Sequence, residues 1–139
     1  MEISILPVKQ EHVQDIINML QSISYYNPPR KDFHRNWEKY KSQSEYYGLV
    51  AILEGAVVGY GSIMIETKIR GGRLGHIEDI CSREDQRNKG IGRLLLNSLY
   101  EVAKKNNCYK IVLSCKEDKV QFYQKCDFSI TGFSLTRYV

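Results

Sequence analysis

The chain has 139 residues, a length that suits a single domain spanning residues 1–139 and leaves no room for a second. Hydrophobic residues make up 42% of it, and no apolar run approaches the roughly 20 residues that cross a bilayer, so we expect a globular protein with no membrane partner. The net charge of +4, without any basic tract, argues against nucleic acid as a partner.

The first half of the chain predicts two helices followed by three strands. Aliphatic residues recur at helical spacing after residue 10, and Pro28-Pro29 forces a turn beyond them. Phe33, Trp37 and Tyr40, at i, i+4 and i+7, predict a second short helix. Apolar runs separated by glycine-containing turns predict the strands. The expected elements are a helix over about 10–23, a short helix around 33–40, and strands over 48–54, 57–66 and 74–80.

The second half begins with a polar, glycine-containing loop. An apolar face from Ile91 to Ala103 predicts an amphipathic helix that starts at this loop, and Asn106-Asn107 predicts its C-cap. Together these patterns predict a mixed α/β domain of the α+β class with one sheet. The remaining elements expected are a strand over 109–114, a short helix over 117–125 and a final alternating strand over 128–138.

The cysteines and the N-terminal residues bear on the cellular compartment. Cys81, Cys108, Cys115 and Cys126 form no CxxC pair and have no histidine at ligand spacing. The first residues carry neither the basic segment nor the long apolar stretch of a secretion signal. We therefore expect reduced thiols, most of them buried, no disulfide, no metal and a cytoplasmic location.

The loop from Arg87 to Gly92 carries the strongest chemical signal. Glycines at 90 and 92 let backbone N–H groups approach a ligand, and they stand at a helix start, where unpaired N–H groups and the helix dipole favour an anion. Lys89 and Arg93 add positive charge. The loop predicts phosphate or pyrophosphate binding, although a tight strand-to-helix turn with solvated charges would share this pattern. It lacks both the GK[ST] ending of a P-loop and the GxGxxG of a dinucleotide site.

The same loop carries a family resemblance. Arg-x-x-Gly-x-Gly after a strand resembles the pyrophosphate-binding motif of GNAT acetyltransferases, with Arg87, Gly90 and Gly92 in its fixed positions. Segments 75–80, 107–111 and 122–126 are similar to glucosamine-6-phosphate N-acetyltransferases, and the likeness runs from about residue 63 to 128.

That resemblance implies a fold, a reaction and an assembly. The implied fold has one central, mostly antiparallel sheet flanked by helices. The implied reaction is direct transfer, in a ternary complex, from acetyl-CoA to the amine of glucosamine 6-phosphate, in UDP-N-acetylglucosamine biosynthesis. Family members are usually homodimers that exchange C-terminal strands, so a homodimer is implied here as well.

The resemblance also implies roles for individual residues. Tyr123 matches the tyrosine that hydrogen-bonds the departing CoA sulfur, and a phenol can stabilise or protonate a thiolate. Glu78 and Asp79 fall where the family contacts the amino sugar, but alternation along a strand would let only one of them face a given site. The implied cofactor-binding residues are Ile80, Cys81, Ser82, Arg87, Asn88, Lys89, Gly90, Ile91, Gly92, Lys119 and Tyr123. The implied substrate-binding residues are Lys68, Ile69, Arg70, Gly71, Glu78, Asp79, Ser114 and Arg137, and the resemblance allows Arg137 to act across a dimer.

Three positions depart from the family pattern. Ser114 stands where an acidic residue is usual, Lys119 where Asn is usual, and Asp127 at a turn that usually has Gly. Asp tolerates the left-handed conformation better than most residues, so we expect the turn at Asp127 to survive. Ser22 or Ser24 would supply a substrate hydroxyl expected near the end of the first helix.

Several alternatives remain open. Tyr123 could be a half-buried core contact, the charges of residues 68–71 could serve solubility alone, and His76 is expected to be a hydrogen-bonded strand residue rather than a base. The acceptor could be another amine, in a peptide, a lysine side chain or a polyamine. A catalytically silent acyl-CoA-binding dimer module would keep the glycine loop without needing Tyr123.

Overall fold

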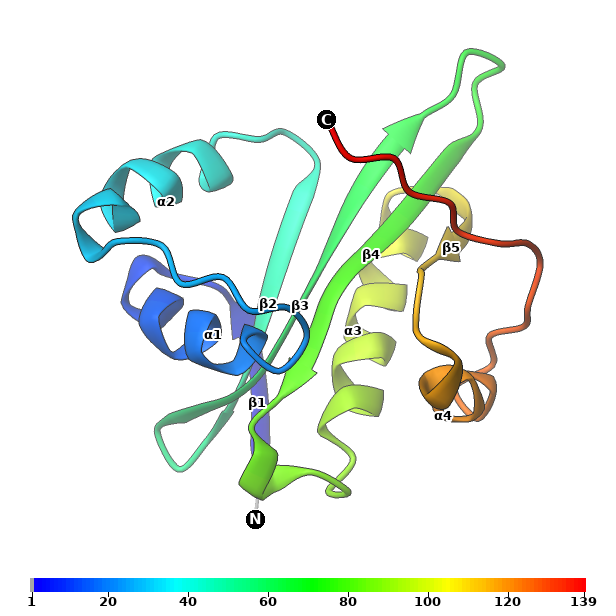
Figure 1. Ribbon diagram of the computed structural model, residues 1–139. Helices are drawn as coiled ribbons and strands as arrows, with labels where there is room; N and C mark the ends of the chain where they lie inside the picture. The colour runs from blue at the N-terminus through cyan, green and yellow to red at the C-terminus, as the bar shows by residue number, and fades with distance from the viewer. Residues whose placement is uncertain (1) are drawn as a thin grey trace.

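The computed structural model describes residues 2–139 and contains a five-stranded sheet in the order β1-β2-β3-β4-β5 (Figure 1). The first four strands are antiparallel to their neighbours, and β5 runs parallel to β4. The mostly antiparallel α+β fold is therefore confirmed. The elements are β1 (Ile3–Pro7), α1 (Val13–Leu20), α2 (Phe33–Lys41), β2 (Tyr46–Leu53), β3 (Ala56–Thr67), β4 (Arg73–Ser82), α3 (Ile91–Lys105), β5 (Cys108–Val112) and α4 (Val120–Gln124).

The two faces of the sheet are covered by different helices. Helix α1 packs Ile16 against Tyr60 and its neighbours on one face, and α3 packs Leu99 against Ile63 on the other. Figure 1 shows α1 and α2 together on one side of the sheet and α3 apart from them. Ile63 and Leu99 have no exposed surface, and full burial of such a side chain stabilises the fold by about 1.5–3 kcal/mol. The central strand β3 is thus held from both sides.

Helix boundaries follow the sequence prediction closely. The predicted helix over 10–23 is a 3-10 turn at Gln10–His12 that continues into α1, and the one over 117–125 is a 3-10 turn at Glu117–Lys119 that continues into α4. Asn106 is the C-cap of α3, and Asn107 follows with a left-handed φ of 60°. The predicted C-cap is therefore confirmed.

Strand β1 is absent from the sequence prediction. It pairs antiparallel with the end of β2, from Ile3 opposite Leu53 to Pro7 opposite Leu49. Its five residues end at a proline, so the alternating pattern is too short to stand out, and its order comes from the neighbouring strand rather than from local propensity.

The predicted final strand over 128–138 is wrong. Within the described part of the chain these residues form no strand, and Figure 1 shows them leaving α4 as an extended coil. A strand needs a neighbour that exchanges backbone hydrogen bonds with it, and no strand among residues 2–139 pairs with this tail. Phe133 and Leu135 are consequently 94% exposed.

Two further expectations concern the burial of the cysteines and the lack of a membrane-spanning segment. All four cysteines are free, but only Cys81 is buried and Cys115 is exposed, so the expectation that most are buried is wrong. Among residues 2–139, no helix is long and apolar enough to cross a membrane.

Candidate functional site

A β-bulge interrupts the pairing of β4 with β3. Ser62 lies opposite Glu78 and Tyr60 lies opposite Cys81, so two β4 residues, Asp79 and Ile80, correspond to one β3 residue between these pairs. Asp79 has a left-handed φ of 59°. An extra residue with positive φ is a common way to form a bulge, and Asp is one of the few non-glycine residues that adopt this conformation readily.

The bulge places Glu78 and Asp79 on the same face of the sheet. Glu78 pairs with Ser62, and paired residues of neighbouring strands share a face. Asp79 lines a cavity of about 260 Å³ between α1, α2 and the sheet, together with Tyr60, whereas Ile80 packs toward α3. The expectation that only one of the two acidic residues can face a given site is therefore wrong, because the bulge shifts the alternation by one residue.

These two carboxylates make the α1–α2 face acidic beside partly buried phenols. Asp79 is solvent-accessible, yet its carboxyl lies over the apolar cavity, and this desolvation raises its pKa. Burial also raises the pKa of Tyr46, and the charges of Asp79 and Glu78 raise it further. Burial raises the pKa of Tyr40 to about 12. The phenols are therefore neutral at physiological pH, and the two carboxylates are groups that can accept hydrogen bonds from an ammonium group.

Beyond the bulge, β4 has an open edge. Its pairing with β5 ends at His76 opposite Val112, but β4 continues to Ser82. Among residues 2–139, no strand pairs with 77–82 on that side. Figure 1 shows β5 and the segment leading to α4 diverging from β4 here. The opening exposes backbone groups of the predicted cofactor residues Ile80, Cys81 and Ser82, which can hydrogen-bond an extended ligand as an added strand would.

The loop after β4 presents backbone N–H groups at the start of α3. Asn88 and Gly90 have left-handed φ values of 66° and 79°, and Gly90 is the N-cap, without a side-chain cap. Left-handed residues next to a helix N-terminus form a concave arrangement of N–H groups that suits an anion. Ile91 begins the helix and is buried beneath the loop. Lys89 donates a hydrogen bond to Gln86 Oε1 at 3.1 Å.

Gly92 has a second, structural reason to be glycine. A Cβ atom there would lie 2.9 Å from Cζ of Phe122 on α4, closer than carbon atoms normally approach. Arg93, at the next position, donates a hydrogen bond to the Lys125 carbonyl at 2.9 Å. The first turn of α3 is therefore packed directly on α4, and Arg93 links the two helices.

Tyr123 lies on α4 beside this contact. Its ring meets those of Phe122 and Phe128 edge-on, with centroids 5.1 Å and 5.8 Å away. Burial raises its pKa to about 12. Asp127, just beyond, adopts a left-handed φ of 71°, as expected for a turn that survives without glycine. The ring is thus a core contact, and the same contacts fix where its hydroxyl points.

The predicted substrate residues 68–71 form the tip of the β3–β4 hairpin. The amide of Lys68 donates to the Gly72 carbonyl at 2.7 Å, and its ammonium lies 3.3 Å from Glu66. The same Glu66 oxygen lies 2.9 Å from Nε2 of His76. The hydrogen bonds from His76 and Lys68 lower the pKa of Glu66. The prediction that His76 is a hydrogen-bonded strand residue is confirmed.

The hairpin tip is too far from the bulge to share one small ligand with it. A strand rises about 3.3 Å per residue, so Glu78 lies roughly 17 Å along β4 from Arg73, and residues 68–71 lie beyond Arg73. This span exceeds the length of a monosaccharide phosphate. Within one chain, therefore, the structure does not bring Lys68, Ile69, Arg70 and Gly71 together with Glu78 and Asp79.

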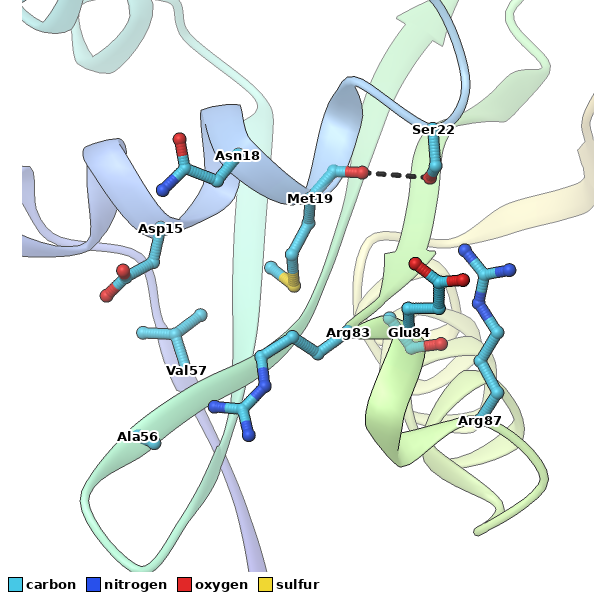
Figure 2. Close-up of a pocket in the computed structure, with 10 residues that line it drawn as sticks. Asp15, Asn18, Met19, Ser22, Ala56, Val57, Arg83, Glu84 and Arg87 are labelled. Carbon is cyan, nitrogen blue, oxygen red and sulfur yellow. Dashed lines mark hydrogen bonds between the residues drawn. The ribbon is translucent and has the colours of Figure 1, made fainter.

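The remaining predicted residues are spread around the open edge. Ser114 and Lys119 are exposed between β5 and α4, and Arg137 is exposed in the C-terminal tail. Ser22 lines a cavity of about 340 Å³ with Ser82 and Arg87, whereas Ser24 does not (Figure 2). Ser22 donates to the Met19 carbonyl at 2.9 Å. Figure 2 shows the side chain of Arg87 reaching toward the end of α1 that carries Ser22.

Sequence reasoning missed the tyrosines and the serine behind the bulge. Tyr40, Tyr46, Tyr60 and Ser62 come from α2, β2 and β3 and meet on the α1–α2 face. The only sequence signal for Tyr46, Tyr60 and Ser62 was a hydroxyl within an otherwise apolar strand segment, and Tyr40 appeared only as one position of the aromatic helix pattern. Among residues 2–139, no group of three or more His, Cys, Asp and Glu could hold a metal ion.

Comparison with known proteins is consistent across sequence and structure. The model of the acetyltransferase (GNAT) family matches residues 13–128. Glucosamine 6-phosphate N-acetyltransferase 1 of Dictyostelium discoideum is 32% identical over 125 residues, covering 86% of this chain and 80% of that protein. The Schizosaccharomyces pombe glucosamine 6-phosphate N-acetyltransferase is 34% identical over 113 residues, covering 78% and 94%. The crystal structure of glucosamine-6-phosphate N-acetyltransferase from Arabidopsis thaliana superimposes with a TM-score of 0.91 at 26% identity, covering 99% of both chains.

Proposed function

Because the chain belongs to the GNAT acetyltransferase family, we propose that it transfers an acetyl group from acetyl-CoA to the amine of glucosamine 6-phosphate. Relatives at 32% and 34% identity carry that name. The observation that carries the proposal is the β4 bulge, which presents Glu78 and Asp79 together immediately before the open edge of β4. Two carboxylates at this point can orient an amino sugar next to a thioester held along that edge.

The residues present fit acetyl-CoA. The open edge at 80–82 can pair with the amide groups of the pantetheine arm, and the N–H groups of residues 87–92 can hold the pyrophosphate. Lys119 lies at the start of α4, where it can contact the cosubstrate as a charge. When bound, acetyl-CoA supplies an activated acyl carbon with a good leaving group.

Direct transfer in a ternary complex needs a neutral amine and a stabilised oxyanion. Glu78 and Asp79 hold the amino group, and its proton leaves through ordered water or a backbone carbonyl. The N–H groups near Ile80 and Cys81 polarise the acetyl carbonyl. Holding both reactants in line removes much of the entropic barrier. Cys81 is unsuited to a covalent route because burial raises its pKa to about 12.

Tyr123 stabilises the departing sulfur as a hydrogen-bond donor rather than as an acid. Burial raises its pKa to about 12, well above the pKa near 8.5 of a free thiol, so proton transfer from the phenol to the thiolate is unfavourable. A hydrogen bond to the thiolate needs no such transfer. The edge-on contacts with Phe122 and Phe128 keep the hydroxyl in place for it.

The sugar phosphate needs cationic partners, and the predicted ones, residues 68–71 and Arg137, do not lie near the bulge within one chain. The hairpin tip lies roughly 17 Å or more along the strand from Glu78, and Arg137 sits in an exposed tail. We infer a homodimer in which Arg137 of the partner subunit reaches the phosphate. The exposed apolar residues of the tail, including Phe133 and Leu135, would be covered in such a dimer. We also propose a cytoplasmic location and a role in UDP-N-acetylglucosamine supply.

Release of free CoA thiol tests the proposed function. The acceptor panel contains glucosamine 6-phosphate, glucosamine, spermidine and a lysine peptide. The proposal predicts strong preference for the phosphorylated sugar. Turnover only with another amine would retain an acetyltransferase but reject the sugar. Tight acetyl-CoA binding without turnover on any acceptor would favour the catalytically silent binding module.

A further inference from the structure

A chain of hydroxyl groups lies directly behind the β4 bulge. Ser62 has no exposed surface, and its Oγ donates a hydrogen bond to the Glu78 carbonyl at 3.2 Å. The Tyr46 hydroxyl lies 3.1 Å from the same Oγ. A serine has one hydroxyl proton, and a carbonyl can only accept, so Tyr46 must be the donor to Ser62. The direction is therefore fixed from Tyr46 to Ser62 to the carbonyl of Glu78.

The Tyr46 ring is itself held in place. Its edge packs against Tyr40 with centroids 5.2 Å apart, and Tyr40 stacks on Trp37 at 5.7 Å. The Tyr40 hydroxyl is 2.7 Å from that of Tyr60. A Cβ atom on Gly48 would clash with the Tyr40 hydroxyl and crowd Val8, so glycine at this position leaves room for the hydroxyl. Residues from α2, β2 and β3 thus converge on the hydroxyl chain.

The hydroxyl chain contacts β4 at the residue where the bulge begins. Glu78 is the last β4 residue in regular register before Asp79 adopts its left-handed φ of 59°. Burial of Cys81 among α1 residues holds the far side of the bulge. On the near side, the Ser62 hydrogen bond exists only while Glu78 stays opposite Ser62. A slip of one residue would turn these side chains to the other face of the sheet.

We propose that Ser62 and Tyr46 are positioning residues, which hold the Glu78 carbonyl and so keep the Glu78 and Asp79 carboxylates together on the acceptor face. This inference rests on the proposed function, because it assigns the two carboxylates to acceptor binding. Neither Ser62 nor Tyr46 has to touch the acceptor. Both act through the backbone of β4, so their loss should affect the acceptor and leave acetyl-CoA almost untouched.

Steady-state kinetics of Ser62→Ala and Tyr46→Phe give the first test. We expect the KM for glucosamine 6-phosphate to rise about tenfold, the effect of losing one buried hydrogen bond, with the KM for acetyl-CoA changed less than about twofold. The control is Ile63→Val, at the next β3 residue, which is equally buried but packs toward α3. It should lower the Tm and leave both KM values unchanged. An unchanged acceptor KM in Ser62→Ala, or an equal rise in Ile63→Val, would overturn the proposal.

Hydrogen exchange gives a second test that needs no acceptor. In Ser62→Ala and Tyr46→Phe, those amides of residues 77–81 that face β3 should exchange about tenfold faster than in Ile63→Val, because the bulge has lost its anchor. If the wild-type protein fails to acetylate the sugar phosphate, the proposed function is lost and exchange alone decides the positioning role. Equal exchange in all three variants would reject that role whatever the acceptor.

Discussion

The backbone at Gly90 allows a stringent test of the anion-binding loop. Gly90 has a φ of 79°, and a Cβ added there would meet no atom within 4 Å. Substitution Gly90→Ala therefore creates no clash, and its cost is the strain of a left-handed alanine, about 1–2 kcal/mol. If the loop relaxes to relieve that strain, the N–H groups at the start of α3 turn away from the pyrophosphate. We expect acetyl-CoA affinity to fall about tenfold or more, since 1.4 kcal/mol is a factor of ten.

Gly55 provides a matched control. It lies in the β2–β3 turn with a φ of 81° and also has nothing within 4 Å of an added Cβ. Gly55→Ala should lower the free energy of unfolding by the same amount, about 1–2 kcal/mol, without changing acetyl-CoA affinity. Urea denaturation measures the stability of both variants, and calorimetric titration measures the affinity. Equal acetyl-CoA affinity in both variants would refute the role of the loop. A Gly90→Ala variant with both the stability and the acetyl-CoA affinity of wild type would refute the strain argument.

Three further predictions concern the acceptor face, the leaving group and the assembly. Tyr123→Phe should lower kcat about tenfold, the value of one hydrogen bond to a charged group, with acetyl-CoA affinity unchanged by titration; an unchanged kcat would remove Tyr123 from the mechanism. Asp79→Asn should raise the KM for glucosamine 6-phosphate. Asp79→Asn should also raise the Tm at pH 7. Burial holds the pKa of Asp79 in the folded state above its unfolded value, so ionisation of Asp79 destabilises the fold. This loss of stability develops as the pH rises from the unfolded-state pKa to the folded-state pKa. Thermal unfolding scans below pH 4 should show no increase in the Tm of Asp79→Asn over wild type. An increase that persists there would contradict the argument that desolvation raises the pKa of Asp79. Sedimentation should give twice the 16.2 kDa chain mass, and a monomer at high concentration would exclude the dimer.

The bulge shows why the sequence predicted part of the site and missed its geometry. The anion loop was recognisable because one of its two left-handed positions, Gly90, is a glycine, and glycine is a visible signal for such backbone. At the bulge the left-handed residue is Asp79. Its carboxylate already suggested a binding role, and an aspartate, unlike a glycine, does not indicate a left-handed backbone. Alternation was then assumed through residues 78–80, and the two carboxylates were assigned to opposite faces.

Strand prediction failed where backbone pairing with a neighbouring strand, rather than the alternating hydrophobic pattern, decides whether a strand forms. Strand β1 has a short pattern but a partner, from Ile3 opposite Leu53, and it forms. Residues 128–138 have a longer alternating pattern, but no strand of the described structure pairs with them, and they do not form one. The amphipathic helices were predicted well because their hydrogen bonds are local and their apolar residues recur at helical spacing over enough residues to identify a helix. Sheet edges depend on distant segments, which a single sequence does not identify.

The open edge of β4 also has a consequence for handling the protein. Backbone groups on 77–82 that no strand of the described structure satisfies can accept any extended chain, including a second molecule of the same protein. The nucleotide thioester would occupy this edge and shield it. A preparation stripped of acetyl-CoA should therefore precipitate or form aggregates more readily on storage than a loaded one, so that the cosubstrate also acts as a cap against edge-to-edge association.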